Sequence, residues 1–160
     1  IDSGKYGYSQ DAIRKYVESA AAHNTISLYQ TNVTPRSVRP YGSALEPVRS
    51  ATERFEISGS IRRPGLFDQW RRILHRPSEY LVVRDDLKPR KDDRFVSTLL
   101  FAPDLDVRLT GRTAIADLGN ARQVRADLLD EDCTVESAKG QQDPILGWAT
   151  LEYLKMTPST

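Results

Sequence analysis

One of the two histidines of this chain, His23, lies where a short helical pattern gives way to a strand-like one. Asp2, far upstream, could share a site with it only if the fold brings the two side chains together. Aspartate and histidine with one or two further donors would suit zinc, which accepts oxygen and nitrogen ligands in tetrahedral sites. The sequence offers no obvious third ligand. Spacing alone leaves open whether His23 binds a metal or is a structural histidine, hydrogen-bonded through one ring nitrogen.

A second group of residues, around Arg71 and Arg72, could bind anions. The planar guanidinium group suits bidentate binding of carboxylate or sulfate. If residues 69–75 form a strand, Trp70 and Arg72 share one face and Arg71 and His75 the other. Neither face is cleanly apolar, so we expect this strand at a sheet edge or along a groove. Two interpretations stay open: arginines paired with nearby acids on an exposed face, or arginines and an aromatic ring that bind an anionic sugar.

No other nucleophilic or phosphate-binding pattern stands out in the sequence. It contains no phosphate-binding P-loop, no Gly-x-Ser-x-Gly elbow and no Cys-x-x-Cys pair. The single cysteine, Cys133, excludes an internal disulfide. The adjacent acids Asp85 and Asp86 would point to opposite faces of a strand, which is the wrong spacing for a cooperating carboxylate pair.

The elements that must position these residues are mostly strands. Asp11 can cap a helix over about residues 12–21, where apolar residues recur at helical spacing. Residues 31–50 hold three prolines and little periodicity, which indicates a long surface loop. Strands are expected over residues 25–29, 53–61, 69–75, 80–85, 94–102, 106–110, 113–118, 134–138 and 148–155.

Short strands that alternate with turn signals, and only one convincing helix, predict an all-β fold. We expect an antiparallel β-sandwich with one short N-terminal helix. Turn chemistry at Arg63-Pro64-Gly65, Arg76-Pro77-Ser78 and Thr110-Gly111 separates the strands. Trp148, within an apolar final strand, is expected in the core.

Length and composition set further limits. The 160 residues suit a single domain over 1–160, large enough to bury a core. The formal net charge of +1 gives no bulk electrostatic case for nucleic-acid binding. No apolar run approaches the roughly 20 residues that cross a bilayer. Because the chain starts at Ile1 without a signal-peptide pattern, we expect a processed product or a piece of a longer protein.

Two stretches carry a resemblance to a known family. Asp2-Ser3-Gly4, followed by two tyrosines, and Ala22-His23-Asn24-Thr25, leading into an aliphatic strand, resemble the C-terminal β domain of the heparinase II/III-like polysaccharide lyases. Trp70-Arg71-Arg72, followed by Leu81-Val82-Val83-Arg84-Asp85, and the stretch from Gly147 to Tyr153 add weaker support.

The resemblance implies a β-sandwich that follows a helical (α/α) toroid in a longer protein, and cleavage of uronic-acid polysaccharides by β-elimination. Members of the family use toroid residues for much of the proton transfer. A His-x-His-x-Asp stretch at the start of their β domain adds one histidine to the active site and another to a zinc ion. Carried over to this chain, the ligands that complete the zinc site are Asp2 and His23.

The family's His-x-His stretch and its toroid are both missing here. The resemblance therefore implies that the base, the active-site histidine and one metal ligand lie upstream. We expect no lyase activity from this chain alone and a structural zinc only in the intact protein. The expected partners are an acidic polysaccharide, bound in part by Arg71 and Arg72, and the upstream toroid, with no role for nucleic acid or membrane. The family also implies a periplasmic or secreted location.

Two other hypotheses stay open. The chain could be a non-catalytic carbohydrate-binding or structural β-sandwich module, in which case no toroid would precede it. It could also be an interaction module whose exposed sheet edge binds a partner protein, with no response to polysaccharide or chelator.

Overall fold

The computed structural model describes residues 4, 6–8, 11–29 and 44–160, which fall into two compact units. The first unit comprises Ile1–Ser27 and Ser97–Thr160, and the second comprises Leu28–Val96. The chain passes from one unit to the other along β1 (Ile26–Leu28) and β7 (Phe95–Ser97), which form a two-stranded sheet. The expectation of one domain over 1–160 stays a prediction. Among the described residues, no helix has the length and apolar character needed to span a membrane.

Strands dominate both units, and the all-β class with one short helix is confirmed. The first unit holds α1 (Ala12–Val17), a 3-10 turn η1 (Ala20–Ala22), β8 (Asp106–Thr110), β9 (Thr113–Asp117), β10 (Gln123–Asp127), β11 (Gln141–Gln142), β12 (Ile145–Leu146), β13 (Trp148–Glu152) and β14 (Lys155–Pro158). The second holds β2 (Ala44–Leu45), β3 (Arg49–Ala51), β4 (Arg54–Arg63), β5 (Phe67–Arg76) and β6 (Tyr80–Pro89).

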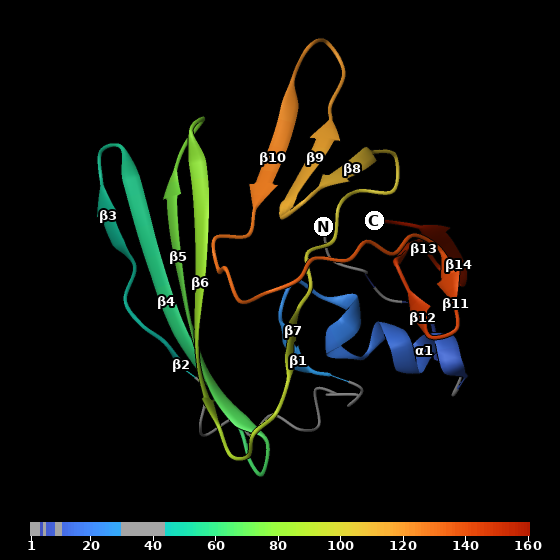
Figure 1. The fold of residues 1–160 in the computed structure, drawn as a ribbon, viewed down its shortest axis with the longest axis horizontal. Coiled ribbons are helices and arrows are strands. Elements are labelled where there is room, and N and C mark those ends of the chain that lie inside the picture. Colours follow the sequence, from blue (N-terminus) through green and yellow to red (C-terminus); the bar gives the residue numbers. More distant parts are fainter. Residues whose placement is uncertain (1–3, 5, 9–10, 30–43) are drawn as a thin grey trace. The chain divides into compact units, whose positions relative to one another are not determined.

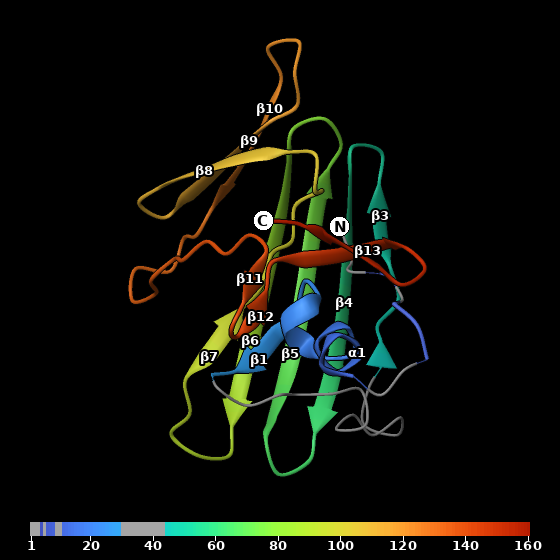
Figure 2. The same ribbon diagram turned by 90° about the vertical axis from the view of Figure 1, so that its right-hand side faces the viewer.

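The second unit is built on one antiparallel sheet with the order β2-β4-β5-β6, and β3 also pairs with β4. Figures 1 and 2 show β4, β5 and β6 as long neighbouring strands. Tight turns at the predicted positions join them, with Gly65 at φ 78° and Ser78 at φ 62°. Left-handed backbone of this kind is easy for glycine and tolerated in turns by small polar residues.

The position of β5 corrects the expectation of an edge strand, because β5 lies between β4 and β6. Every residue from Phe67 to His75 has a partner on both neighbouring strands. The polar residues on both of its faces are therefore accommodated by side chains of the flanking strands rather than by an open edge.

The core of the second unit centres on Phe67, whose side chain is 0% exposed. Its ring packs edge-on against Phe95, with the centroids 5.1 Å apart. The guanidinium carbon of the buried Arg63 lies 5.3 Å from the Phe67 ring centroid. Burial lowers the pKa of Arg63. The apolar contact is concentrated at the turn between β4 and β5, where Arg63 and Phe67 are directly opposite one another.

In the first unit, helix α1 begins as predicted but ends sooner. The Asp11 carboxylate accepts a hydrogen bond from the Arg14 amide at 2.8 Å, which is an N-cap contact. The predicted helix to residue 21 is wrong beyond Val17, because Ser19 has extended backbone and its hydroxyl donates to the Tyr16 carbonyl at 2.6 Å. The short 3-10 turn η1 then leads to His23.

Tyr16 ties α1 to β13. Its hydroxyl donates to the Trp148 carbonyl and accepts from the Trp148 amide, both at 3.2 Å. Burial raises the pKa of Tyr16, so the phenol stays protonated and able to donate. Trp148 packs against the core cluster of Tyr16, Val17 and Ala22, as predicted, although its ring is only partly buried. In Figure 1, α1 lies beside the strands β11 to β14 of the same unit.

One strand prediction in the first unit is wrong, and one observed strand was not predicted. Residues 134–138 alternate in polarity but do not form a strand. β10 forms at Gln123–Asp127, within a polar stretch for which no strand is expected. β10 pairs with β9, and β9 with β8, so Val124, Ala116 and Val107 align on one face. Pairing to a neighbour, rather than local composition, decides which segment becomes a strand.

Replacing Phe67 by alanine should destabilise the second unit by about 3–5 kcal/mol, because a fully buried ring leaves a cavity. Urea unfolding followed by tryptophan fluorescence measures the change, since Trp70 lies in the same unit. Leu45→Ala is the control, because Leu45 is 80% exposed and its loss should cost under about 0.5 kcal/mol. A loss below about 1 kcal/mol for Phe67→Ala would contradict the assignment of this core.

Candidate functional site

His23 stands at the end of η1, where its backbone turns extended and leads toward β1. Its Nε2 atom lies 2.9 Å from the Val17 carbonyl oxygen. A carbonyl can only accept, so Nε2 carries the proton in the neutral ring and Nδ1 carries the lone pair. Metal-bound histidines commonly donate their second ring N–H to a backbone carbonyl in this way. The ring orientation therefore fits a histidine that binds a metal through Nδ1, and it equally fits a structural histidine.

The second predicted ligand, Asp2, lies outside the described residues. Within the part of the chain that the structure describes, no cluster of three His, Cys, Asp or Glu side chains could hold a metal ion. The structure thus describes the surroundings of His23, and the assignment of Asp2 as a metal ligand stays a prediction.

The residues that follow His23 anchor the chain. The Asn24 side-chain oxygen accepts a hydrogen bond of 2.6 Å from the amide of the buried Leu100. The Thr25 carbonyl accepts from the Thr98 amide at 3.0 Å. Sequence reasoning missed this role of Asn24, because Leu100 is distant in sequence and only the fold brings the two together. The Asn24 side chain and the Thr25 carbonyl are thereby both hydrogen-bonded to residues 98–100.

Arg71 and Arg72, adjacent in sequence, lie on opposite faces of β5 as predicted. Arg71 forms a bidentate pair with Asp85 on β6, with Nε and Nη2 each 2.8 Å from a carboxylate oxygen. Gln69 donates to the same carboxylate at 2.7 Å. The Asp85 side chain is only 12% exposed. Arg71 and Asp85 thus form an ion pair that is largely withdrawn from solvent, and Gln69 adds a hydrogen bond to the same carboxylate. The bidentate contact gives the pair a well-defined geometry.

Arg72 is in a different situation, because its side chain is 61% exposed. Its Nε lies 3.2 Å from a carboxylate oxygen of Glu56 on β4. On β6 its direct neighbour is Arg84, which is 68% exposed and pairs with Asp86 at 2.8 Å. The predicted separation of Asp85 and Asp86 onto opposite faces is confirmed, since each serves a different arginine.

The structure of β5 therefore contains features that match both interpretations, arginines paired with acids and arginines exposed to bind an anion. Arg71 is held by an acid, while Arg72 presents an exposed guanidinium beside a second one on Arg84. An exposed guanidinium pair can bind carboxylate or sulfate through charge-assisted hydrogen bonds. A guanidinium group offers N–H donors in a fixed fork and no acceptor, so the chemistry supported here is binding and orientation of an anion.

Comparison with known proteins identifies the family. A protein-family model described as heparinase II/III-like, C-terminal, matches residues 1–160. The chain therefore belongs to this family, which confirms the resemblance seen in Asp2-Ser3-Gly4 and Ala22-His23-Asn24-Thr25. No curated protein matches the chain significantly.

The fold also has a counterpart among solved structures. The crystal structure of heparan sulfate lyase HepC from Pedobacter heparinus aligns with 99% of this chain at a TM-score of 0.80 and 14% sequence identity. At that identity the likeness shows a shared fold. The aligned region is 24% of the HepC chain, so this chain spans about a quarter of that protein's length.

Replacing Asp85 by asparagine should destabilise the second unit by about 1–3 kcal/mol, because the half-buried Arg71 charge loses its bidentate partner. Urea unfolding measures the change. Asp86→Asn is a matched control on the next residue of the same strand. The Asp86 side chain is 56% exposed, so its loss should cost at most about 0.5 kcal/mol. Equal losses of unfolding free energy in the two variants would show that the Arg71–Asp85 pair stabilises the unit no more than an exposed surface pair does.

Proposed function

We propose that this chain is the β domain of a polysaccharide lyase that cleaves uronic-acid polysaccharide by β-elimination. The observation that carries the proposal is the family match over the whole chain, joined to a fold shared with a heparan sulfate lyase. Heparan sulfate is an acidic polysaccharide, which supports an acidic polysaccharide as the substrate class here as well.

The proposed reaction removes a weakly acidic proton α to the uronate carboxylate and expels the group attached at the neighbouring carbon. Such a step needs a base and groups that stabilise the enolate-like charge as it develops. This chain's contribution would be to bind and orient the anionic polymer. Arg72 has the exposed guanidinium for a direct contact. Arg71 lies on the other face of β5 with its charge balanced by Asp85, so the direct contact with the polymer is assigned to Arg72.

The base and the charge-stabilising groups are proposed to come from a helical toroid that precedes this chain in the intact protein. That division of labour follows from the family resemblance, since this chain has no His-x-His stretch. The β domain would then act as one wall of the substrate cleft, and by itself it would lack the means to move the proton.

A structural zinc ion bound by Asp2 and His23 is the second part of the proposal. The hydrogen bond from Nε2 of His23 to the Val17 carbonyl supports it, because it places the lone pair on Nδ1. An aspartate oxygen and an imidazole nitrogen suit zinc, and at least one further ligand would have to come from the upstream part of the protein. Zinc would supply folding stability at this position rather than chemistry on the substrate.

The chain alone should release no unsaturated product from alginate, heparan sulfate or related uronans, whereas the intact protein should cleave at least one of them. Absorbance of the unsaturated uronate product measures the reaction. Robust cleavage by the isolated chain would contradict the proposed division of labour, and an inactive intact protein would contradict the lyase assignment.

Asp2→Ala and His23→Ala should each remove bound zinc from the intact protein, because a site with three or four ligands tolerates the loss of one poorly. Metal analysis of the purified proteins gives the zinc content without reference to activity. His75→Ala is the control, since His75 packs against the Phe55 ring in the second unit. Unchanged zinc in the Asp2 and His23 variants would exclude these residues as ligands.

A further inference from the structure

One face of the second unit's sheet concentrates positive charge. We call it the basic face and define it as the side of strands β3 to β6 from which Arg72 projects. Because side chains alternate along each strand and the register of β4, β5 and β6 is unbroken, the strand pairing fixes its members. They are Arg49, Ala51, Arg54, Glu56, Ser58, Ser60, Arg62, Asp68, Trp70, Arg72, Leu74, Arg76, Tyr80, Val82, Arg84, Asp86 and Lys88.

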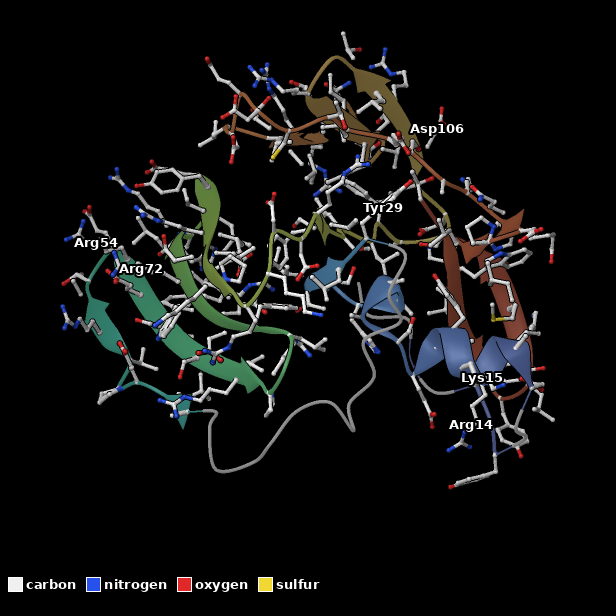
Figure 3. The ribbon with its side chains drawn as sticks, turned by 60° about the horizontal axis from the view of Figure 1, so that its bottom comes forward. Arg14, Lys15, Tyr29, Arg54, Arg72 and Asp106 are labelled. Atoms are coloured by element: carbon white, nitrogen blue, oxygen red, sulfur yellow. The ribbon has the colours of Figure 1, made fainter. Side chains whose placement is uncertain are left out.

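The basic face carries seven basic and three acidic side chains. Three residues near the face pair with its members: Arg90 with Asp68, and Glu53 and Glu79 with Arg76. Counting them leaves eight basic and five acidic residues, so the excess is still positive. The whole chain has a net charge of only +1, and the remainder of the chain is therefore net acidic. Figure 3 shows Arg54 and Arg72 on the same side of this sheet.

Trp70 sits among the basic residues of this face. Its side chain is 43% exposed, which is unusual for a large ring in the central strand of a sheet. Arg72 is its neighbour along β5, and Ser60 and Asp86 are its partners across the sheet. The four diagonal positions on the flanking strands, ~7–8 Å away and within reach of long side chains, hold Ser58, Arg62, Arg84 and Lys88.

Stability alone does not account for this arrangement. Arg72 and Arg84 are directly opposite one another, a placement of like charges that weakens a sheet. Glu56 and Asp86 neutralise these two arginines. Arg62 and Lys88 are both exposed and lie directly across the sheet from Asp68, whose nearly buried carboxylate pairs with Arg90. The acids offset the positive charge of the basic face only in part, and a bound anion would offset the excess that remains.

We infer that Trp70 and the basic residues around it, Arg62, Arg72, Arg84 and Lys88, form a binding site for an anionic saccharide unit of a linear polysaccharide. The sugar ring would stack on the exposed indole, as amphipathic rings do on aromatic side chains. The arginines would bind its carboxylate or sulfate groups through two-pronged hydrogen bonds, and Ser58 and Ser60 would face its hydroxyl groups. This inference rests on the proposed function for the class of ligand, and it adds the residues and the face that bind it.

A nucleic acid is the rival occupant of a basic surface. Proteins that bind single strands stack successive bases on several aromatic side chains along a basic groove. Around Trp70, the neighbouring positions hold serines and charged residues rather than further aromatic rings. One ring, two hydroxyls and four cations match a single charged sugar better than a run of bases.

The test measures binding of size-defined heparin oligosaccharides to the chain by tryptophan fluorescence. A Trp148→Phe background leaves Trp70 as the only indole. Binding should shift the Trp70 emission and should weaken as salt rises. Arg62→Gln with Arg84→Gln should weaken binding about tenfold, as expected for the loss of two charge-assisted contacts. Trp70→Ala, measured by calorimetry, should weaken it by a similar factor.

The three-stranded sheet supplies a matched control. Arg108 and Arg125 flank Ile115 across β8, β9 and β10, and Arg125 pairs with Asp127 two residues on, as Arg84 does with Asp86. Arg108→Gln with Arg125→Gln removes the same charge and should change the affinity less than twofold. Circular dichroism checks that every variant folds.

Three results would overturn the inference. They are equal loss of binding in the control variant, no binding of heparin oligosaccharides by the wild-type chain, and tighter binding of a single-stranded oligonucleotide that needs the same residues. The lyase assay of the intact protein is read separately. Unchanged KM in an active protein with the Arg62 and Arg84 substitutions would reject this site and leave the proposed function standing. An inactive intact protein whose β domain binds heparin through Trp70 would reject the proposed lyase function and leave this binding site standing.

Discussion

The unbroken pairing of β4, β5 and β6 is the constraint on which the second unit depends. Two tight turns, at Gly65 and Ser78, set its register, and no bulge interrupts either pair. Because side chains alternate with a period of two, a slip of one residue would exchange the two faces. Phe67 would then leave the core, Arg71 would lose Asp85, and the cations around Trp70 would be dispersed. Packing, ion pairing and the proposed binding site are thus three consequences of one register.

The first unit depends on contacts between distant parts of the chain. Tyr16 bonds both backbone groups of Trp148, and Asn24 accepts from the Leu100 amide. These bonds position the short α1 and η1, which are too short to be stable as isolated helices. The orientation of His23 follows from them, since its ring bonds to the carbonyl of Val17, the last residue of α1. A metal-binding role for His23 would therefore use a geometry that the fold already maintains.

Much of the fold could be predicted from local signals. The turn residues at 63–65 and 76–78 locate the long hairpins, and counting outward from the second turn pairs Arg71 with Asp85 and Arg72 with Arg84. Asp11 marks the start of α1. The errors arise where a distant partner decides the outcome. Residues 134–138 alternate without becoming a strand, whereas the polar stretch Gln123–Asp127 becomes β10 by pairing with β9. The two hairpins already place β5 between β4 and β6, whereas the pairing of β2 and β3 with β4 depends on contacts that strand composition does not encode.

The candidate residues show why spacing and net charge predict a binding site only in part. Arg71 and Arg72 have the same side chain at adjacent positions, yet one is held by a nearly buried carboxylate and the other is exposed beside Arg84. Counting from the turn shows which arginine is opposite an acid, but only the structure shows how far each side chain is withdrawn from solvent. In the same way, a formal charge of +1 is a sum over the whole chain, whereas a ligand responds to the field at one surface. The alternation of β4, β5 and β6 collects the cations on one side, so a nearly neutral chain can still present a surface suited to a polyanion.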